Sequence, residues 1–221
     1  MPQPKWSEVD AYFADRLAVS DPTLDSVLAA NAAAGLPAID VSPAQGKFLY
    51  LLARMVGSAR ILEIGALGGY STIWLARALS PGGGVVTLEA NPRHADVARA
   101  NFQRAGVADR IDLRIGAALD SLPILAAEGG PPFDFVFIDA DKTNNPTYFS
   151  WALRLTRSGA VIVVDNVVRS GAVADRGSRD PDVRGVRKLF DMMATEPRVS
   201  ATALQTVGMK GWDGLAIALV N

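Results

Sequence analysis

The chain has 221 residues, 49% of them hydrophobic, which is enough for one domain with a sizeable buried core. Its 22 Lys and Arg nearly balance its 23 Asp and Glu without a long run of either sign, which argues against nucleic-acid binding. The lack of cysteine excludes disulfides and thiolate chemistry, and a single histidine leaves no material for a His-based triad or a multi-histidine metal site.

Residues 1–43 are expected to form a mostly helical N-terminal extension. Its apolar residues Val9, Tyr12, Phe13 and Leu17 would cover an active site, pack on the core or bind another subunit. No signal-peptide pattern occurs, and no stretch approaches the roughly 18 apolar residues that a membrane span needs. A cytoplasmic protein without membrane contact is expected.

From residue 44 onwards, hydrophobic periodicity predicts alternating strands and helices bracketed by turn residues. Strands are predicted at 61–64, 85–88, 111–115, 133–139 and 160–165, and helices at 48–56, 71–79, 92–105, 119–127 and 148–155. Five such repeats are typical of a doubly wound parallel α/β sheet.

The last part of the chain changes pattern. After a helix near 183–193, two β-like runs at 200–207 and 215–220 flank a loop at 208–214, which predicts an antiparallel hairpin. The expected fold is therefore one domain over residues 1–221, whose Rossmann-like core, residues 44–221, contains a mostly parallel seven-stranded sheet.

Two buried apolar runs end abruptly in oxygen ligands. Asp139 follows the first run, and Asp165 and Asn166 follow the second. If these parallel strands are neighbours, they lie about 4.8 Å apart, and the three side chains can share one ion. Hard oxygen ligands favour a divalent cation. Taken alone, an Asp-Asn pair more commonly caps a turn.

A glycine turn follows the first predicted strand, with Gly65, Gly68 and Gly69 before Ser71. Glycines there let the backbone approach a ligand, and the helix N-terminus favours negative charge, so a nucleotide-like cofactor is indicated. The spacing is G-x-x-G-G rather than the dinucleotide pattern G-x-G-x-x-G.

Two glutamates sharpen the choice of cofactor. Glu89 ends the second strand, where a carboxylate accepts hydrogen bonds from ribose hydroxyls; NAD and S-adenosylmethionine both satisfy this. Glu63 is expected to project into the region of a dinucleotide's pyrophosphate and to repel it, which favours the cationic S-adenosylmethionine. The carboxylate of that cofactor would use the helix N-terminus at Gly69 and Ser71. The simpler interpretation of Glu63 is a helix cap or a surface salt bridge.

From about residue 41 to 220 the chain resembles the cation-dependent O-methyltransferases, the group that includes the caffeoyl-CoA and catechol O-methyltransferases. Residues 62–65, 69–71, 137–142 and 165–166 carry the resemblance. It implies the class I fold of S-adenosylmethionine-dependent methyltransferases, and a homodimer.

The resemblance also implies roles for individual residues. Asp139, Asp165 and Asn166 would bind Mg²⁺, or Mn²⁺ or Ca²⁺, and Lys142 would be the general base beside Asp139. The implied cofactor contacts are Val41, Glu63, Gly65, Ala66, Ser71, Glu89, Ala118 and Asp141. Asp141 is equally well interpreted as a helix N-cap, and Lys142, taken alone, as a surface lysine.

The chemistry of these residues agrees with that implication. Two carboxylates and one amide oxygen leave open positions on an octahedral cation for the hydroxyls of a catechol-like phenolic substrate. The cation would lower the hydroxyl pKa, Lys142 would take the proton, and the phenolate would attack the sulfonium methyl group in line.

Some positions depart from the family pattern. Thr143, Asn144 and Asn145 replace an acidic or polar pair followed by tyrosine, and Ser170 replaces the asparagine that touches substrate in the plant enzymes. Residues 169–181 are expected to form a mobile loop at the pocket mouth, and Trp212 and Asp213 of the hairpin loop to line the same pocket.

Two alternatives remain at this point. One is an NAD-dependent oxidoreductase on the same sheet, which the glycine spacing disfavours, and the other is a non-catalytic cofactor-binding protein. His94, in the first turn of a polar-faced helix, is expected to be an exposed residue without a role.

Overall fold

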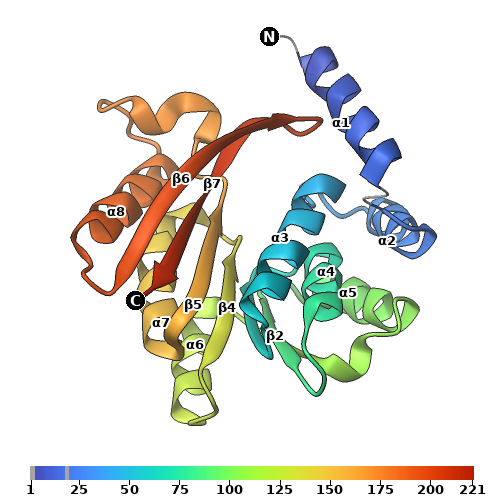
Figure 1. Cartoon of the computed structure of the whole chain (residues 1–221), viewed down its shortest axis with the longest axis horizontal. Helices are drawn as coiled ribbons and strands as arrows, with labels where there is room; N and C mark the ends of the chain where they lie inside the picture. Colours follow the sequence, from blue (N-terminus) through green and yellow to red (C-terminus); the bar gives the residue numbers. More distant parts are fainter. Residues whose placement is uncertain (1–2, 18–19) are drawn as a thin grey trace.

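A computed structural model describes residues 3–17 and 20–221 and shows a central sheet flanked by helices (Figure 1). Residues 1–2 and 18–19 of the expected N-terminal extension lie outside the described residues. The elements are α1 (Gln3–Leu17), α2 (Pro22–Ala33), α3 (Pro43–Val56), β1 (Arg60–Ile64), α4 (Tyr70–Ala78), β2 (Gly84–Glu89), α5 (Pro92–Arg104), η1 (Ala108–Arg110), β3 (Ile111–Ile115), α6 (Ala118–Ala127), β4 (Phe133–Ile138), η2 (Lys142–Asn144), α7 (Asn145–Leu155), β5 (Thr156–Asp165), η3 (Arg169–Ala174), α8 (Pro181–Thr195), β6 (Val199–Gly208) and β7 (Gly211–Val220).

The seven strands form one sheet in the order β3-β2-β1-β4-β5-β7-β6. The first five are parallel, and β7 runs antiparallel to both β5 and β6. The predicted doubly wound sheet with a terminal hairpin is confirmed. Its strand order reverses between β1 and β4, and open sheets of this kind bind ligands at the carboxyl ends of the strands beside that switch point.

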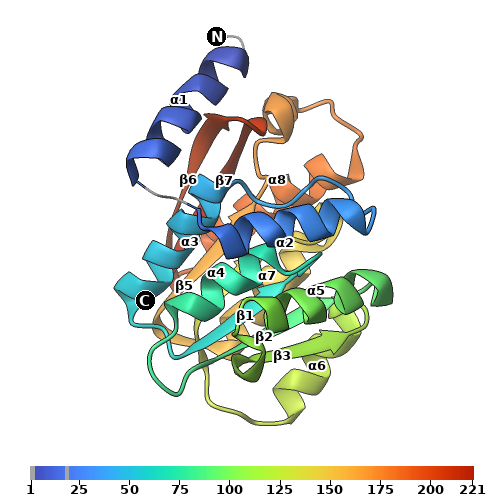
Figure 2. The same ribbon diagram turned by 90° about the vertical axis from the view of Figure 1, so that its right-hand side faces the viewer.

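Helices cover both faces of the sheet, which explains why its central strands are buried and mostly apolar. Helices α2, α3, α4 and α5 lie on one face and α6, α7 and α8 on the other (Figures 1 and 2). Strand side chains alternate between the faces: Phe135 and Phe137 pack with the first group, and Val136 and Ile138 with the second.

The hairpin is tighter than the sequence pattern predicts. Strands β6 and β7 stay paired as far as Gly208 and Gly211, so the turn consists of Met209 and Lys210 alone. Trp212 and Asp213 are therefore strand residues rather than loop residues. The glycines mark the two ends of the turn, and the positive φ of Gly211, 97°, suits glycine there.

The N-terminal helices differ in how they pack. Helix α2 buries Leu24 and Val27 in the core on its side of the sheet. Helix α1 buries none of its residues 4–17, and it contacts the hairpin turn, where Asp10 Oδ2 accepts a hydrogen bond from Met209 N (2.7 Å). Among the described helices, none has the length and apolar character needed to cross a membrane.

Candidate active site

Four strands deliver their last residues to one edge of the sheet. Ile64 of β1 is level with Leu88 of β2 and with Ile138 of β4. Strand β5 continues this level through Val164, the partner of Ile138. The next residues along these strands are Gly65, Glu89, Asp139 and Asp165. The parallel register thus brings together residues that lie far apart in the sequence.

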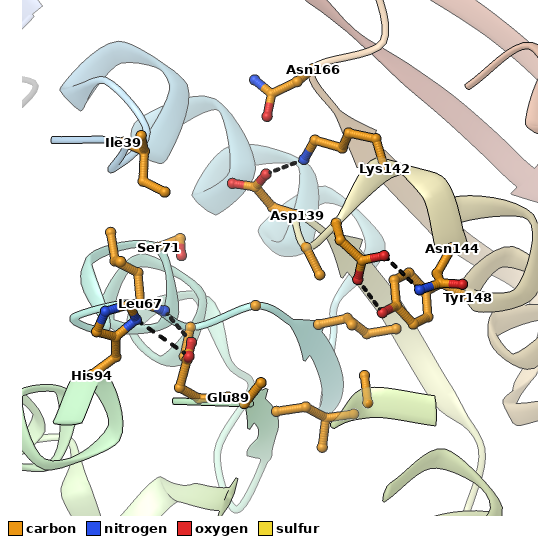
Figure 3. A pocket seen from close by; sticks show the side chains of 18 of the residues that line it. Ile39, Leu67, Ser71, Glu89, His94, Asp139, Lys142, Asn144, Tyr148 and Asn166 are labelled. Atoms are coloured by element: carbon orange, nitrogen blue, oxygen red, sulfur yellow. Dashed lines mark hydrogen bonds and ion pairs between the residues drawn. The ribbon is translucent and has the colours of Figure 1, made fainter. Parts of the chain in front are cut away.

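A cavity of about 600 Å³, here called the main cavity, opens over this edge (Figure 3). The predicted site residues that line it are Val41, Gly65, Ala66, Ser71, Glu89, Ala118, Asp139, Asp141, Lys142 and Asn166. Glu63, Gly69 and Asp165 are not part of its lining.

The turn after β1 has the close backbone approach that its glycines suggest. At Gly65, where φ is 101°, a Cβ would lie 2.3 Å from the carbonyl oxygen of Asp139, so no other residue fits. Gly69 has a different reason, because a Cβ there would lie 2.4 Å from the ring of Phe102. Gly69 therefore packs helix α4 against helix α5 instead of facing the main cavity.

Glu89 supports the glycine turn and also faces the main cavity. Its Oε2 accepts a hydrogen bond from Leu67 N (2.8 Å), and its Oε1 accepts one from Asn91 N (2.9 Å). Leu67 has a φ of 49°, in the left-handed region, and this hydrogen bond holds it there.

His94 corrects an expectation. Its side chain is 22% exposed, lines the main cavity and places Nδ1 3.4 Å from Glu89 Oε1 (Figure 3). Helix α5 begins three residues after the end of β2, so its first turn is brought over the cavity. That short connection is a signal that the sequence did contain.

Glu63 does not project into the main cavity, contrary to the expectation. It is fully buried beneath the first turn of α4, where it accepts hydrogen bonds from Ser71 Oγ and Thr87 Oγ1 (both 2.6 Å) and from the Thr72 hydroxyl. Burial raises the pKa of Glu63 to about 7, although the three hydroxyls act to lower it. It is neither a surface salt bridge nor a direct cavity group, and it reaches the cavity through Ser71.

The three proposed metal ligands lie around Lys142. Lys142 Nζ donates to Asp139 Oδ1 (2.7 Å), and Figure 3 shows the Asn166 side chain over this pair. Asp165 is 5% exposed; burial, followed by the charge of Asp139, raises its pKa to about 7. Asn166 has a φ of 56°, a conformation that asparagine tolerates better than most residues.

This arrangement fits a divalent cation. Burial and the neighbouring charge of Asp139 disfavour the charge of Asp165, and a cation would relieve both effects. Within residues 3–17 and 20–221, no group of three or more His, Cys, Asp or Glu side chains is placed to hold a metal. A third protein ligand must therefore be of another type, and the amide of Asn166 is at hand.

Asp141 occupies the N-cap position of η2, but its side chain makes no capping hydrogen bond. Its carboxylate instead accepts hydrogen bonds from Tyr148 Oη and from Asn144 Nδ2 (2.6 Å), at the wall of the main cavity (Figure 3). Burial, followed by Asp141, raises the pKa of Tyr148. Sequence reasoning missed these two partners, although they lie only three and seven residues further along the chain.

Helix α8 buttresses the segment that carries Lys142. A Cβ on Gly185 would lie 2.2 Å from the carbonyl oxygen of Lys142. Asp182 Oδ1 accepts from Thr143 N (3.2 Å) and Thr143 Oγ1 (3.0 Å). Lys142 itself is only 6% exposed, so it is not a surface lysine.

A second cavity of about 440 Å³, here called the hairpin cavity, lies between the start of α3, the end of β5 and the β6–β7 hairpin. It shares Asn166 with the main cavity, and its other lining residues include Gln45, Asp165 and Asp213. Gln45 Nε2 donates to Asp165 Oδ2 (2.6 Å), a contact across 120 residues that no local pattern reveals.

Strand β7 holds the loop that follows the metal ligands. Asp213 Oδ1 accepts from the backbone N–H groups of Val168 (3.0 Å), Arg169 (3.2 Å) and Gly214 (3.0 Å). The Arg169 side chain pairs with Asp182 (3.4 Å), so an acid of the protein neutralises it. The segment expected to be mobile begins with η3 and is anchored in this way at its first residue.

A sheet of this strand order, with a glycine turn after β1 and an acid at the end of β2, defines the class I fold of S-adenosylmethionine-dependent methyltransferases. The sequence profile of the O-methyltransferase family matches residues 16–219. The chain therefore belongs to the O-methyltransferase family, and it is an S-adenosylmethionine-dependent O-methyltransferase. The oxidoreductase and non-catalytic alternatives no longer apply.

Individual relatives are similar along their whole length. A catechol O-methyltransferase of Mycobacterium tuberculosis is 57% identical, with 99% of this chain and 98% of the relative covered. The crystal structure of an O-methyltransferase from Bacillus cereus in complex with SAH has a TM-score of 0.98 and 60% identity, with both chains fully covered. The O-methyltransferase TomG from Streptomyces achromogenes, solved with SAM, has a TM-score of 0.97 and 49% identity over 100% of this chain and 99% of its own.

Proposed function

We propose that this enzyme methylates one hydroxyl of a catechol-like small molecule and that Asp139, Asp165 and Asn166 hold a divalent cation, Mg²⁺ or a similar ion, for that reaction. The observation that carries the proposal is the pair of adjacent carboxylates beside Lys142 and Asn166, where the main cavity meets the hairpin cavity. The name of the 57% identical relative supports the choice of a catechol as the acceptor.

The main cavity is the proposed cofactor site. Its volume of about 600 Å³ lies within the range of small-molecule sites. Glu89 would accept hydrogen bonds from the ribose hydroxyls, as acids at this position of the fold do, and the backbone at Gly65 permits close approach. The start of α4 at Ser71 offers backbone N–H groups to the cofactor carboxylate. The further proposed contacts are Val41, Ala66, Ala118 and Asp141.

The cofactor and the cation would supply two chemical functions that the side chains of the site do not provide. When bound, S-adenosylmethionine provides the methyl group, and the cation provides Lewis acidity toward the acceptor hydroxyl. Lys142 is the basic residue that is already hydrogen-bonded to a proposed ligand, Asp139, and it is proposed to accept the hydroxyl proton through Nζ. The main cavity and the hairpin cavity would hold cofactor and acceptor side by side, so that the two reacting atoms are aligned.

The same proposal covers the whole chain. Residues 1–43 would serve as a helical extension of a core at 44–221, and together they would form one methyltransferase domain. The enzyme would act as a homodimer. The support is helix α1, whose residues Tyr12, Phe13 and Leu17 form an exposed apolar stripe.

Chelation combined with one variant tests the proposed metal chemistry. Transfer of methyl from S-adenosylmethionine to catechol is expected to need Mg²⁺ and to stop in excess EDTA. Asp165→Ala should lose turnover while calorimetry still detects S-adenosylmethionine binding, because Asp165 does not line the main cavity. Full turnover of catechol in excess EDTA would reject the metal-dependent mechanism.

A further inference from the structure

The side chain of Gln45 makes one hydrogen bond that the reaction described above does not use. Its Nε2 donates to Asp165 Oδ2 at 2.6 Å, from the first turn of α3 to the end of β5. We propose that Gln45 is a positioning residue that orients the Asp165 carboxylate for the divalent cation. This inference rests on the proposed metal site.

The local sequence directs Gln45 elsewhere, which makes its actual partner informative. Ser42 is the N-cap of α3, and Ser42 Oγ accepts a hydrogen bond from Gln45 N (3.2 Å). Ser42-x-x-Gln45 is thus a capping-box sequence, in which the glutamine side chain usually reaches back to the N–H of the cap residue. Here the side-chain amide donates to Asp165 instead. The hydrogen bond from Gln45 N to Ser42 Oγ is the half of the capping box that remains. The glutamine side chain, which would form the other half, instead supports the proposed ligand Asp165.

Asp165 needs such a donor because it is buried. Its Oδ1 accepts from the N–H of Asn166 (2.8 Å), and its Oδ2 accepts from Gln45. Two donors, one on each oxygen, fix the rotation of the carboxylate. Hydrogen-bond partners of metal-ligating carboxylates hold the ligand in place, and removing one weakens metal affinity or activity about 10- to 100-fold.

Helix α3 is a firm base for this contact. A Cβ on Gly46, the next residue, would lie 2.3 Å from the indole ring of Trp74, so α3 and α4 pack together without a gap. Gln45 also lines the hairpin cavity, whereas it is not part of the main-cavity lining. Its loss should therefore affect the cation and leave the cofactor unaffected.

Metal affinity is the direct readout. Mn²⁺ binding to the full-length protein is measured by electron paramagnetic resonance or calorimetry in the wild type, Gln45→Met and Gln45→Asn. The methionine keeps the length of the side chain without its donor, and the asparagine keeps the amide but is too short. Gln205→Met is the matched control, because Gln205 lines the same cavity and bonds to Trp212 instead of a proposed ligand.

Both Gln45 variants are expected to raise the Kd for Mn²⁺ by about 10- to 100-fold, while Gln205→Met does not change it. Their Kd for S-adenosylmethionine should stay within about twofold of wild type, which also shows that they are folded. In turnover assays, the metal concentration for half-activation should rise in proportion, with kcat recovering at saturating metal. A Kd for Mn²⁺ equal to that of wild type in both variants would overturn the inference alone. If wild type and Asp165→Ala bound Mn²⁺ equally, the proposed metal site would fail as well.

Discussion

At the scale of single residues, the four acids at the sheet edge differ mainly in what surrounds them. Glu89 accepts hydrogen bonds from backbone N–H groups and faces the main cavity. Glu63 is enclosed by hydroxyls, Asp139 by Lys142, and Asp165 by the donors of Gln45 and Asn166. Residue type alone does not distinguish these acids. Their surroundings indicate which of them support the fold and which face the proposed ligands.

Lys142→Met tests the proposed base. The substitution keeps much of the side-chain volume at a buried site but removes the proton acceptor, so kcat should fall by about 10²- to 10⁴-fold. The Kd for S-adenosylmethionine, measured by calorimetry, should change little. Lys188→Met, on the exposed side of α8, is the control and should keep full activity. A Lys142→Met enzyme with wild-type kcat would contradict the proposed role.

The raised pKa of Glu63 predicts that the stability of the metal-free protein depends on pH. Its pKa in the folded state, about 7, is above its ordinary value of 4.5, so the folded state binds this proton more tightly than the unfolded state. Stability should therefore fall as pH rises from about 4.5 to about 7, by at most on the order of 3 kcal/mol, and then level off for this group. Urea unfolding between pH 5 and 8 should show a shallower decline for Glu63→Gln than for wild type. Parallel declines would show that Glu63 is not the titrating group.

At the scale of elements, the packing of α8 against η2 connects this helix to the segment that carries the proposed base. Gly185 permits the close approach, and Asp182 binds Thr143 next to Lys142. The sequence predicts α8 correctly as a helix, but hydrophobic periodicity does not indicate which backbone atom its glycine will meet.

Gly185→Ala tests that packing. The added Cβ would clash with backbone that cannot move like a flexible side chain, so a loss of about 1–3 kcal/mol in the free energy of unfolding is expected. Displacement of Lys142 should lower kcat as well. Chemical denaturation and initial-rate assays measure the two effects, and Arg184→Ala, on the exposed side of the same helix, serves as control. Unchanged stability and kcat in Gly185→Ala would show that the contact is unimportant.

At the scale of the whole molecule, α1 differs from the other α-helices of the described chain, because none of its residues 4–17 is buried. Figure 1 shows it beside the tip of the hairpin, and it contacts β6 and α3. Asp10 of α1 lines the hairpin cavity, which meets the main cavity at Asn166, so α1 borders the proposed acceptor site.

The proposed homodimer is tested through the apolar stripe of α1. Phe13 and Leu17 are 48% and 66% exposed, and Phe13→Asp with Leu17→Asp would place charges in an interface formed there. Wild type should sediment as a dimer and the double variant as a monomer, with thermal unfolding showing that both are folded. Lys188→Asp, on the exposed side of α8, is the control. A monomeric wild type would reject the proposal.

Much of this structure can be predicted from the sequence, because the patterns that determine the strands and helices are local. Apolar runs of strand length, turn residues between them and helix caps suffice for the order of the strands and α-helices from residue 44 to 195, although not for η1, η2 and η3. The placement of Asp139, Asp165 and Asn166 at one edge also follows, because residues after neighbouring parallel strands must lie level. The glycine turn and Glu89 follow for the same reason.

The remaining features of the site depend on the tertiary structure. The burial of Glu63 under α4, the approach of His94 to Glu89, the hydrogen bond from Gln45 to Asp165 and the second cavity beside the hairpin all depend on which surfaces meet. A side chain's direction and its partners 24 or 120 residues away leave no trace in local periodicity. Short-range patterns establish the elements and the acids at their ends, whereas packing between distant elements determines which of those acids face a ligand.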